Sequence, residues 1–236
     1  MRLDKYLVKC NIGSRSEVKE YIKKGLVRVG GVPAKKPDIN VDENKDEVFF
    51  KGDKLVYKEF VYIILNKPAG VVTATTDDRD KTVLDLIDTL PAKDLSPVGR
   101  LDKDTTGLLL ITNNGELAHN LLSPRKHVDK TYLVRPGHKL TEDDIKKLCE
   151  GVDIGDKEPT LPAKAILKDD GDLLLTIHEG RFHQVKRMLE AVDNKVIALK
   201  RISFGPLELP ADLKEGEWRE LTEDELKRNG MLDSGC

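Results

Sequence analysis

Apolar residues recur every three or four positions near the start of the chain, in residues 3–10 and again in residues 18–22. This spacing predicts two short helices, the second of which Ser14 or Ser16 can cap. Shorter apolar runs follow, and the Gly30-Gly31 pair is suited to the tight turn of a β-hairpin. The pattern therefore predicts a small module of two helices and a few strands.

From Val61 onward, strand-like and helix-like segments alternate, which predicts an α+β domain with a substantial mixed sheet. A polar stretch with a Gly52-Asp53 turn separates the two patterns, so we place the boundary near Lys58, with domains at 1–58 and 59–236. The expected strands are residues 61–65, 71–75, 107–112, 130–135, 173–178 and 195–204, and the expected helices are residues 115–122, 141–151 and 181–192.

The net charge of -2 conceals an uneven distribution of charge along the chain. Residues 1–36 hold ten Lys or Arg side chains against three acidic ones, a local balance of +7. A compact basic module indicates a polyanionic partner, with nucleic acid as the first candidate. A solvated charged surface would give the same pattern, so charge alone does not decide between these two interpretations.

The sequence contains no apolar stretch of about 18 residues, the length at which a membrane span is predicted. Its charged first residues are also unlike a signal peptide, so we expect a cytoplasmic protein with no membrane partner. Three cysteines lie far apart, without the paired spacing of a metal site or a disulfide framework. We therefore expect no metal.

A dense polar loop precedes the apolar run at residues 107–112. Asp102 and Asp104 are spaced as at the start of a calcium-binding loop. However, Asn113 stands where such a loop needs a bidentate Glu, which argues against calcium. A purely structural turn remains possible, because Asp, Thr and Gly are common turn residues.

The loop sequence GRLDKDTTGLLLIT, residues 99–112, is similar to the signature loop of pseudouridine synthases that modify single uridines of ribosomal RNA. Residues 65–70, 130–132 and 179–188 resemble further motifs of that family in the same order, and the likeness extends to about Leu226. The chain most resembles the small-subunit type, which acts at uridine 516 of 16S rRNA. A large-subunit 23S rRNA enzyme of the same family is the main alternative.

The first quarter of the chain, with RLDKYL and SRSEVKEYIKKGLVRVGG, resembles the S4 RNA-binding domain. The resemblance implies that five basic side chains face RNA phosphates and contribute affinity without base choice. They are Arg2, Arg15, Lys19, Lys23 and Lys24. The alternative is a basic helical hairpin that packs on its own domain.

The family resemblance implies that Asp102 is the catalytic carboxylate. The reaction breaks the N-glycosidic bond of uridine, turns the base and rejoins it through carbon, so we expect no cofactor. Asp102 could add covalently to the sugar or the base, or act as a base at the ribose. Lys186 occupies the family's position for a cation that orients this carboxylate, although a surface lysine is the simpler interpretation of one residue.

A stacked uridine must be flipped out before it can react, and an aromatic side chain can then stack on it. The resemblance gives this role to Tyr132, whose hydroxyl could also help to move the proton lost from carbon five. Arg100 would fill the space left by the base and contact phosphate. Arg181, His183 and Gln184 would contact RNA or support the pocket.

Two other functions remain open at the level of sequence. A ribosome-assembly factor could keep the fold and bind RNA without catalysis. An N-glycosidase could instead cleave the base away with Asp102 and Asp104 as its two carboxylates. In each interpretation that involves RNA, the expected partner is ribosomal RNA or a ribosomal-subunit assembly intermediate, and we expect the protein to be a monomer.

Overall fold

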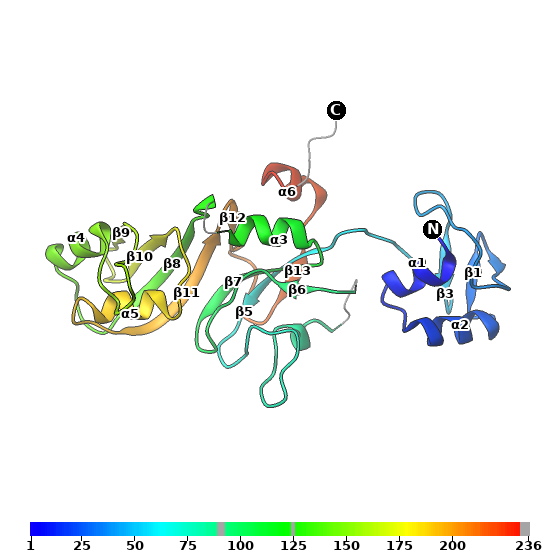
Figure 1. The fold of residues 1–236 in the computed structure, drawn as a ribbon, viewed down its shortest axis with the longest axis horizontal. Coiled ribbons are helices and arrows are strands. Elements are labelled where there is room, and N and C mark those ends of the chain that lie inside the picture. The colour runs from blue at the N-terminus through cyan, green and yellow to red at the C-terminus, as the bar shows by residue number, and fades with distance from the viewer. Residues whose placement is uncertain (89–92, 124–125, 232–236) are drawn as a thin grey trace. The chain divides into compact units, whose positions relative to one another are not determined.

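The computed structural model describes residues 1–88, 93–123 and 126–231. The chain forms two compact units, Met1–Val61 with Asp88–Leu95, and Tyr62–Ile87 with Ser96–Cys236. Each unit contains its own sheet (Figure 1). The boundary that we predicted near Lys58 lies in the segment between the last strand of the first sheet and the first strand of the second.

The first unit packs two helices against a four-stranded antiparallel sheet of order β2-β1-β3-β4. Apolar side chains of both helices, including Leu7 and Ile22, are buried together with Val27 and Val48 of the sheet. The predicted helices and the hairpin at Gly30-Gly31 are therefore confirmed. The elements are α1 (Leu3–Lys9), α2 (Arg15–Lys23), β1 (Val27–Val29), β2 (Val32–Pro33), β3 (Val48–Phe50) and β4 (Asp53–Leu55).

The start of α2 is fixed by a capping box. The Ser14 hydroxyl accepts a hydrogen bond from the Glu17 backbone N–H at 3.3 Å, and the Glu17 carboxylate accepts one from the Ser14 N–H at 2.8 Å. These bonds satisfy backbone donors that a helix start leaves free. Of the two serines that the sequence offered, Ser14 is the cap because a Glu follows it by three positions.

The second unit is built on a nine-stranded sheet whose main path is β13-β5-β7-β11-β8-β10-β9, with β12 beside β11 and β6 beside β7 (Figure 1). The β7–β11 pair is parallel and the other pairs are antiparallel, so the predicted mixed sheet is confirmed. The strands are β5 (Tyr62–Lys67), β6 (Ser96–Pro97), β7 (Thr106–Thr112), β8 (Lys130–Pro136), β9 (Lys164–Leu167), β10 (Leu173–Ile177), β11 (Val196–Phe204), β12 (Leu207–Glu208) and β13 (Trp218–Glu220).

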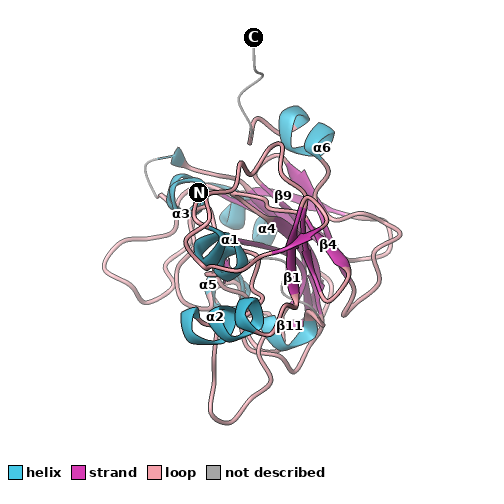
Figure 2. Cartoon of the chain, turned by 90° about the vertical axis from the view of Figure 1, so that its right-hand side faces the viewer, coloured by secondary structure: helices cyan, strands magenta, loops and turns pink. Residues whose placement is uncertain are grey.

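The central strands β5 and β7 are buried on both faces. Leucines and isoleucines of β5 and β7 form a core to which α3 and α6 contribute, while α4 packs on β9 and α5 packs on β11. Strands and loops separate these short helices along the chain (Figure 2). None of the described helices is long and apolar enough to span a membrane. The helices are α3 (Gly115–Leu122), α4 (Glu142–Glu150), α5 (Gln184–Glu190) and α6 (Glu223–Arg228), with a 3-10 turn at Leu84–Leu86.

Two sequence predictions differ from the structure. Residues 71–75 were expected to be a strand, but they form only an isolated bridge at Val72, because the Val72 backbone bonds to the loop residues Lys81 and Val83 and not to a strand. The helix expected from residue 181 begins at Gln184. His183, just before it, has a φ of 48°, a left-handed conformation that a right-handed helix cannot contain.

The parallel pairing of β7 with β11 predicts that Gly107 cannot be replaced. Gly107 has a φ of 102°, and a Cβ atom there would lie 2.2 Å from the backbone oxygen of Arg201. We expect Gly107→Ala to lower the free energy of unfolding in urea by roughly 3 kcal/mol or more. The control Gly171→Ala, with a φ of 87° and open space around it, should cost about 1 kcal/mol. Equal losses would contradict the close approach of the two strands.

Candidate active site

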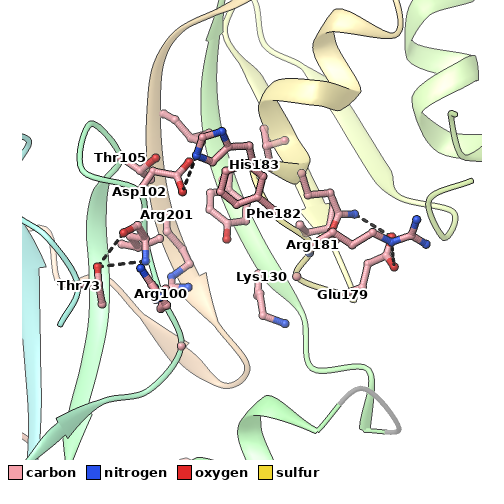
Figure 3. A pocket seen from close by; sticks show the side chains of 18 of the residues that line it. Thr73, Arg100, Asp102, Thr105, Lys130, Glu179, Arg181, Phe182, His183 and Arg201 are labelled. Atoms are coloured by element: carbon pink, nitrogen blue, oxygen red, sulfur yellow. Dashed lines mark hydrogen bonds and ion pairs between the residues drawn. The ribbon is translucent and has the colours of Figure 1, made fainter. Parts of the chain in front are cut away.

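The second unit contains a cavity of about 790 Å³ beside the loop that carries Asp102 (Figure 3). Its walls are the loop at residues 99–103, strand β8, the end of β11 and the segment at residues 177–186. This volume lies in the range of small-molecule sites in proteins. The cavity is therefore large enough for a single nucleoside and is lined by side chains that the sequence singled out.

The Asp102 loop is anchored on one side by a buried side chain. It connects β6 to β7, and Leu101, immediately before the aspartate, is 5% exposed. The Thr73 hydroxyl donates a hydrogen bond to the Leu101 carbonyl at 2.7 Å and accepts one from the Leu101 N–H at 3.2 Å. These contacts fix the backbone at the residue before Asp102.

A buried lysine anchors the other side of the loop. Lys67, the last residue of β5, is fully buried, and its ammonium group donates hydrogen bonds to backbone carbonyls at distances of 3.0 to 3.3 Å. Burial lowers the pKa of Lys67 to about 8, although the nearby carboxylates act in the opposite direction. The lysine ties the loop to the central sheet. Its acceptors are the carbonyls of Pro68, Asp102, Lys103 and Thr105.

The carboxylate of Asp102 lies between the side chains of His183, just before α5, and Lys186, in the first turn of α5. One of its oxygens is 3.1 Å from the Lys186 ammonium nitrogen, and the other is 3.6 Å from Nε2 of His183 (Figure 3 shows the His183 pair). Asp102 is 30% exposed and lines the cavity. The structure thus brings Asp102 and Lys186 together across 84 residues of sequence, as the resemblance implied.

Lys186 also hydrogen-bonds Asp104, at 2.7 Å. Burial acts to lower the pKa of Lys186, but hydrogen bonds with the two carboxylates outweigh it, and the pKa is raised. The same hydrogen bond lowers the pKa of Asp104. The two carboxylates differ in position, because Asp104 is 72% exposed and is absent from the cavity lining, whereas Asp102 faces the cavity.

An aromatic side chain and a basic one complete the wall near the loop. Tyr132, on β8, is 8% exposed and lines the cavity. It is held in the sheet between its partners Leu175 on β10 and Arg201 on β11. Arg100 is exposed and also lines the cavity. The predicted residues Arg100, Asp102, Tyr132 and Lys186 therefore surround one cavity.

The remaining residues of the third motif are engaged within the protein. Arg181 donates hydrogen bonds to the Glu179 carboxylate at 2.9 Å and to the carbonyls of Glu158 and Pro159. Gln184 is buried, donates to Glu179 and accepts a hydrogen bond from the Arg181 N–H. These contacts support the cavity wall, and direct contact of Arg181, His183 and Gln184 with RNA stays a prediction.

Arg201 is a residue of the cavity wall that the sequence analysis missed. It is 2% exposed, its Nε donates a hydrogen bond to the Leu108 carbonyl at 2.8 Å, and its guanidinium lies 4.9 Å from the centre of the Phe204 ring. One terminal nitrogen of Arg201 and the hydroxyl of Thr105 are buried without a hydrogen-bond partner. The run of apolar residues around Arg201 predicted a strand, and nothing in that run indicated that its cation would line a cavity.

The five basic residues assigned to RNA phosphates belong to the first unit. Arg15, Lys19 and Lys23 are exposed on α2 at intervals of four residues, so they share one side of the helix, and Lys24 is exposed at its end. Arg2 is exposed but hydrogen-bonded to the Asp4 carboxylate at 2.8 and 3.1 Å. Their contact with RNA stays a prediction.

No set of three or more His, Cys, Asp or Glu side chains within the described residues is arranged to hold a metal ion. The chemistry available in the cavity is therefore that of a carboxylate held between a lysine and a histidine, an aromatic ring and a buried guanidinium. Such a site can donate or accept protons, stack on a base and stabilise negative charge.

Comparison with known proteins identifies the family. Residues 61–191 match the model of the RNA pseudouridylate synthase family, and residues 1–47 match that of the S4 domain. The chain belongs to the RNA pseudouridylate synthase family. The predicted family, the S4 domain and the assignment as an enzyme are confirmed.

The synthase is similar to relatives of more than one kind over nearly its whole length. An uncharacterised RNA pseudouridine synthase of Bacillus subtilis is 49% identical over 96% of this chain and 97% of that protein. The ribosomal small subunit pseudouridine synthase A of Haemophilus influenzae is 40% identical (97% and 99% covered). The ribosomal large subunit pseudouridine synthase B of Bacillus subtilis is 39% identical (99% and 98% covered). These matches do not single out the small-subunit type.

A solved structure supports the same assignment. A crystal structure of a pseudouridylate synthase has a TM-score of 0.67 to this chain, with 39% identity over 96% of this chain and 98% of that one. The α+β fold with an S4 domain followed by a catalytic domain is thus the fold of this family.

The buried ammonium of Lys67 predicts how the stability of the synthase depends on pH. Its pKa of about 8 lies below the value of about 10.5 for an exposed lysine, so the folded protein binds fewer protons than the unfolded chain between these values. The cost of burying the charge is fully present below pH 8 and is relieved as the pH rises toward 10.5. The stability of the wild type relative to Lys67→Met should therefore rise across this window, by up to about 3 kcal/mol.

The measurement is urea unfolding of the wild type and the variant from pH 7 to pH 10. Lys67→Met should also slow single-turnover catalysis, by roughly 100-fold, because the Asp102 carbonyl loses its anchor. Lys168→Met, at an exposed lysine of the same unit, is the control and should leave the rate unchanged. A pH-independent difference in stability, or full activity of Lys67→Met, would contradict the anchoring role.

Proposed function

We propose that the protein converts one uridine of ribosomal RNA to pseudouridine and that its target lies in the small-subunit 16S rRNA. The observation that carries the proposal is the Asp102 carboxylate, which faces the cavity 3.1 Å from the Lys186 ammonium. Relatives named for ribosomal RNA modification, covering nearly the whole chain, support the substrate class.

Asp102 is the proposed catalytic carboxylate. The ammonium of Lys186 stabilises the negative charge of Asp102 and orients one of its oxygens. In this position the carboxylate faces a nucleoside bound in the cavity. Asp102 then either adds covalently to the sugar or base, or takes a proton from the ribose while the uracil is detached. Asp104 lies outside the cavity lining, which disfavours a two-carboxylate glycosidase in which both carboxylates act on one sugar.

Tyr132, Arg100 and Arg201 have distinct proposed roles in the flipped-base complex. The ring of Tyr132 stacks on the uracil, and its hydroxyl assists the loss of the proton from carbon five. Arg100, exposed at the cavity, fills the space left in the RNA and contacts phosphate. The buried charge of Arg201 favours the negative charge that uracil carries once its bond to the sugar is broken.

The N-terminal module supplies affinity for the RNA. Arg15, Lys19 and Lys23 share one side of α2 and are exposed, an arrangement suited to successive phosphates. We propose that ribosomal RNA, free or in a subunit-assembly intermediate, is the partner of this module and that the protein acts as a monomer.

The large-subunit 23S rRNA is the alternative substrate. The large-subunit relative is 39% identical and the small-subunit relative is 40% identical, so overall identity does not separate them. Site choice in RNA depends on three-dimensional contacts that a catalytic loop does not encode.

The experiment is to incubate the protein with unmodified small-subunit and large-subunit rRNA, each free and in assembling particles, and to map pseudouridine by nucleotide. One new pseudouridine in the small-subunit RNA is the expected result. A new pseudouridine in the large-subunit RNA alone would move the assignment to the alternative. Tight binding of both RNAs with no pseudouridine in either would contradict catalysis and favour a non-catalytic RNA-binding factor.

A further inference from the structure

Phe182 is a large apolar side chain with no role in the reaction described above. It is 76% exposed, more than any other large apolar side chain in the described part of the chain. In RNA-binding proteins, exposed aromatic rings commonly stack on unpaired bases. The position of Phe182 therefore decides whether it could contact the substrate.

The ring of Phe182 is held in place. It stacks on the imidazole of His183, with the ring centres 3.8 Å apart and the planes inclined by 18°. The Phe182 carbonyl accepts a hydrogen bond from the Arg187 guanidinium at 3.0 Å, and His183 adopts a left-handed backbone conformation with a φ of 48°. A non-glycine residue keeps such a conformation only where its surroundings enforce it. The two rings are thus presented as a fixed, layered pair.

This pair lies beside Asp102 on the wall of the cavity. Both rings line the cavity, and Nε2 of His183 is 3.6 Å from the Asp102 carboxylate (Figure 3). His183 covers one face of Phe182, while the high exposure of Phe182 leaves the other face accessible to solvent. A base stacked on that free face would be separated by the Phe182 ring from His183, the side chain next to Asp102. That separation matches a nucleotide adjacent to the one that reacts.

We propose that Phe182 is a stacking platform for an unpaired base that neighbours the target uridine, with His183 as the supporting layer beneath it. The platform would hold the strand open at the mouth of the cavity after the uridine has been flipped. The inference rests on the proposed function for the position of the target uridine at Asp102. The stacked partner is a nucleobase because every base has a π-face, so the platform contributes affinity without strict base choice.

The test uses short RNA hairpins that contain the expected target, uridine 516 of 16S rRNA, and carry 2-aminopurine immediately before or immediately after it. Stacking on an aromatic ring quenches 2-aminopurine fluorescence. The variants are Phe182→Leu, which keeps an apolar side chain but removes the ring, and Phe182→Tyr, which restores a ring. The matched control is Phe60→Leu, at another exposed phenylalanine, which lies in the first unit.

We expect quenching at one of the two flanking positions with the wild type and with Phe182→Tyr, and its loss with Phe182→Leu. Base stacking on aromatic side chains predicts that Phe182→Leu binds the hairpin about 10-fold more weakly, and that Phe182→Tyr and Phe60→Leu stay within about 2-fold of the wild type. The melting temperature of Phe182→Leu should not fall, since an exposed ring contributes little to the core.

Unchanged affinity and unchanged fluorescence with Phe182→Leu would overturn the proposal, and so would an equal loss of affinity with Phe60→Leu. Binding and fluorescence need no turnover, so they separate this inference from the proposed function. Quenching that depends on Phe182, in an RNA that gains no pseudouridine, would support the platform and contradict the proposed catalysis. Pseudouridine formation without such quenching would support the proposed catalysis and contradict the platform.

Discussion

The hydrogen bonds from the buried ammonium of Lys67 to the carbonyls of the reactive loop are the contact on which the site depends. A loop that carries a reactive group must be held within a fraction of an ångström, yet residues 98–105 belong to no strand of the sheet. Lys67 ends the central strand β5, so the loop inherits the rigidity of the sheet core. The hydroxyl of Thr73 acts in the same way on the residue before Asp102.

Two carboxylates share one lysine but differ in their exposure. Lys186 binds both Asp102 and Asp104, but only Asp102 lines the cavity, so the exposed Asp104 helps to position the lysine while Asp102 faces the cavity. On the β11 wall of the cavity, Arg201 is buried without a carboxylate partner in the described residues. A substrate that brings negative charge into the cavity would compensate that cation, which agrees with RNA chemistry.

Local signals in the sequence were enough to predict much of the fold and the loop that carries Asp102. The Ser14 cap followed by Glu17 and the uniformly apolar run of β7 each specify their element without distant contacts. The roles of Lys67 and Arg201 were not predictable, because a lysine or arginine within an apolar strand gives no sign of the carbonyls or the cavity it will meet. The failed strand at residues 71–75 has the same origin, since its own pattern gives no sign that Val72 will bond to the loop residues Lys81 and Val83.

The central claim is that Asp102, and not its neighbour Asp104, performs the chemistry. The most direct measurement is tritium release from RNA labelled at carbon five of uridine, under single-turnover conditions with excess enzyme. Asp102→Asn should release no tritium while it still binds the RNA, and Asp104→Asn should retain activity within about 10-fold of the wild type, as expected for loss of one exposed ion pair. Tritium release by Asp102→Asn at the wild-type rate would contradict the account.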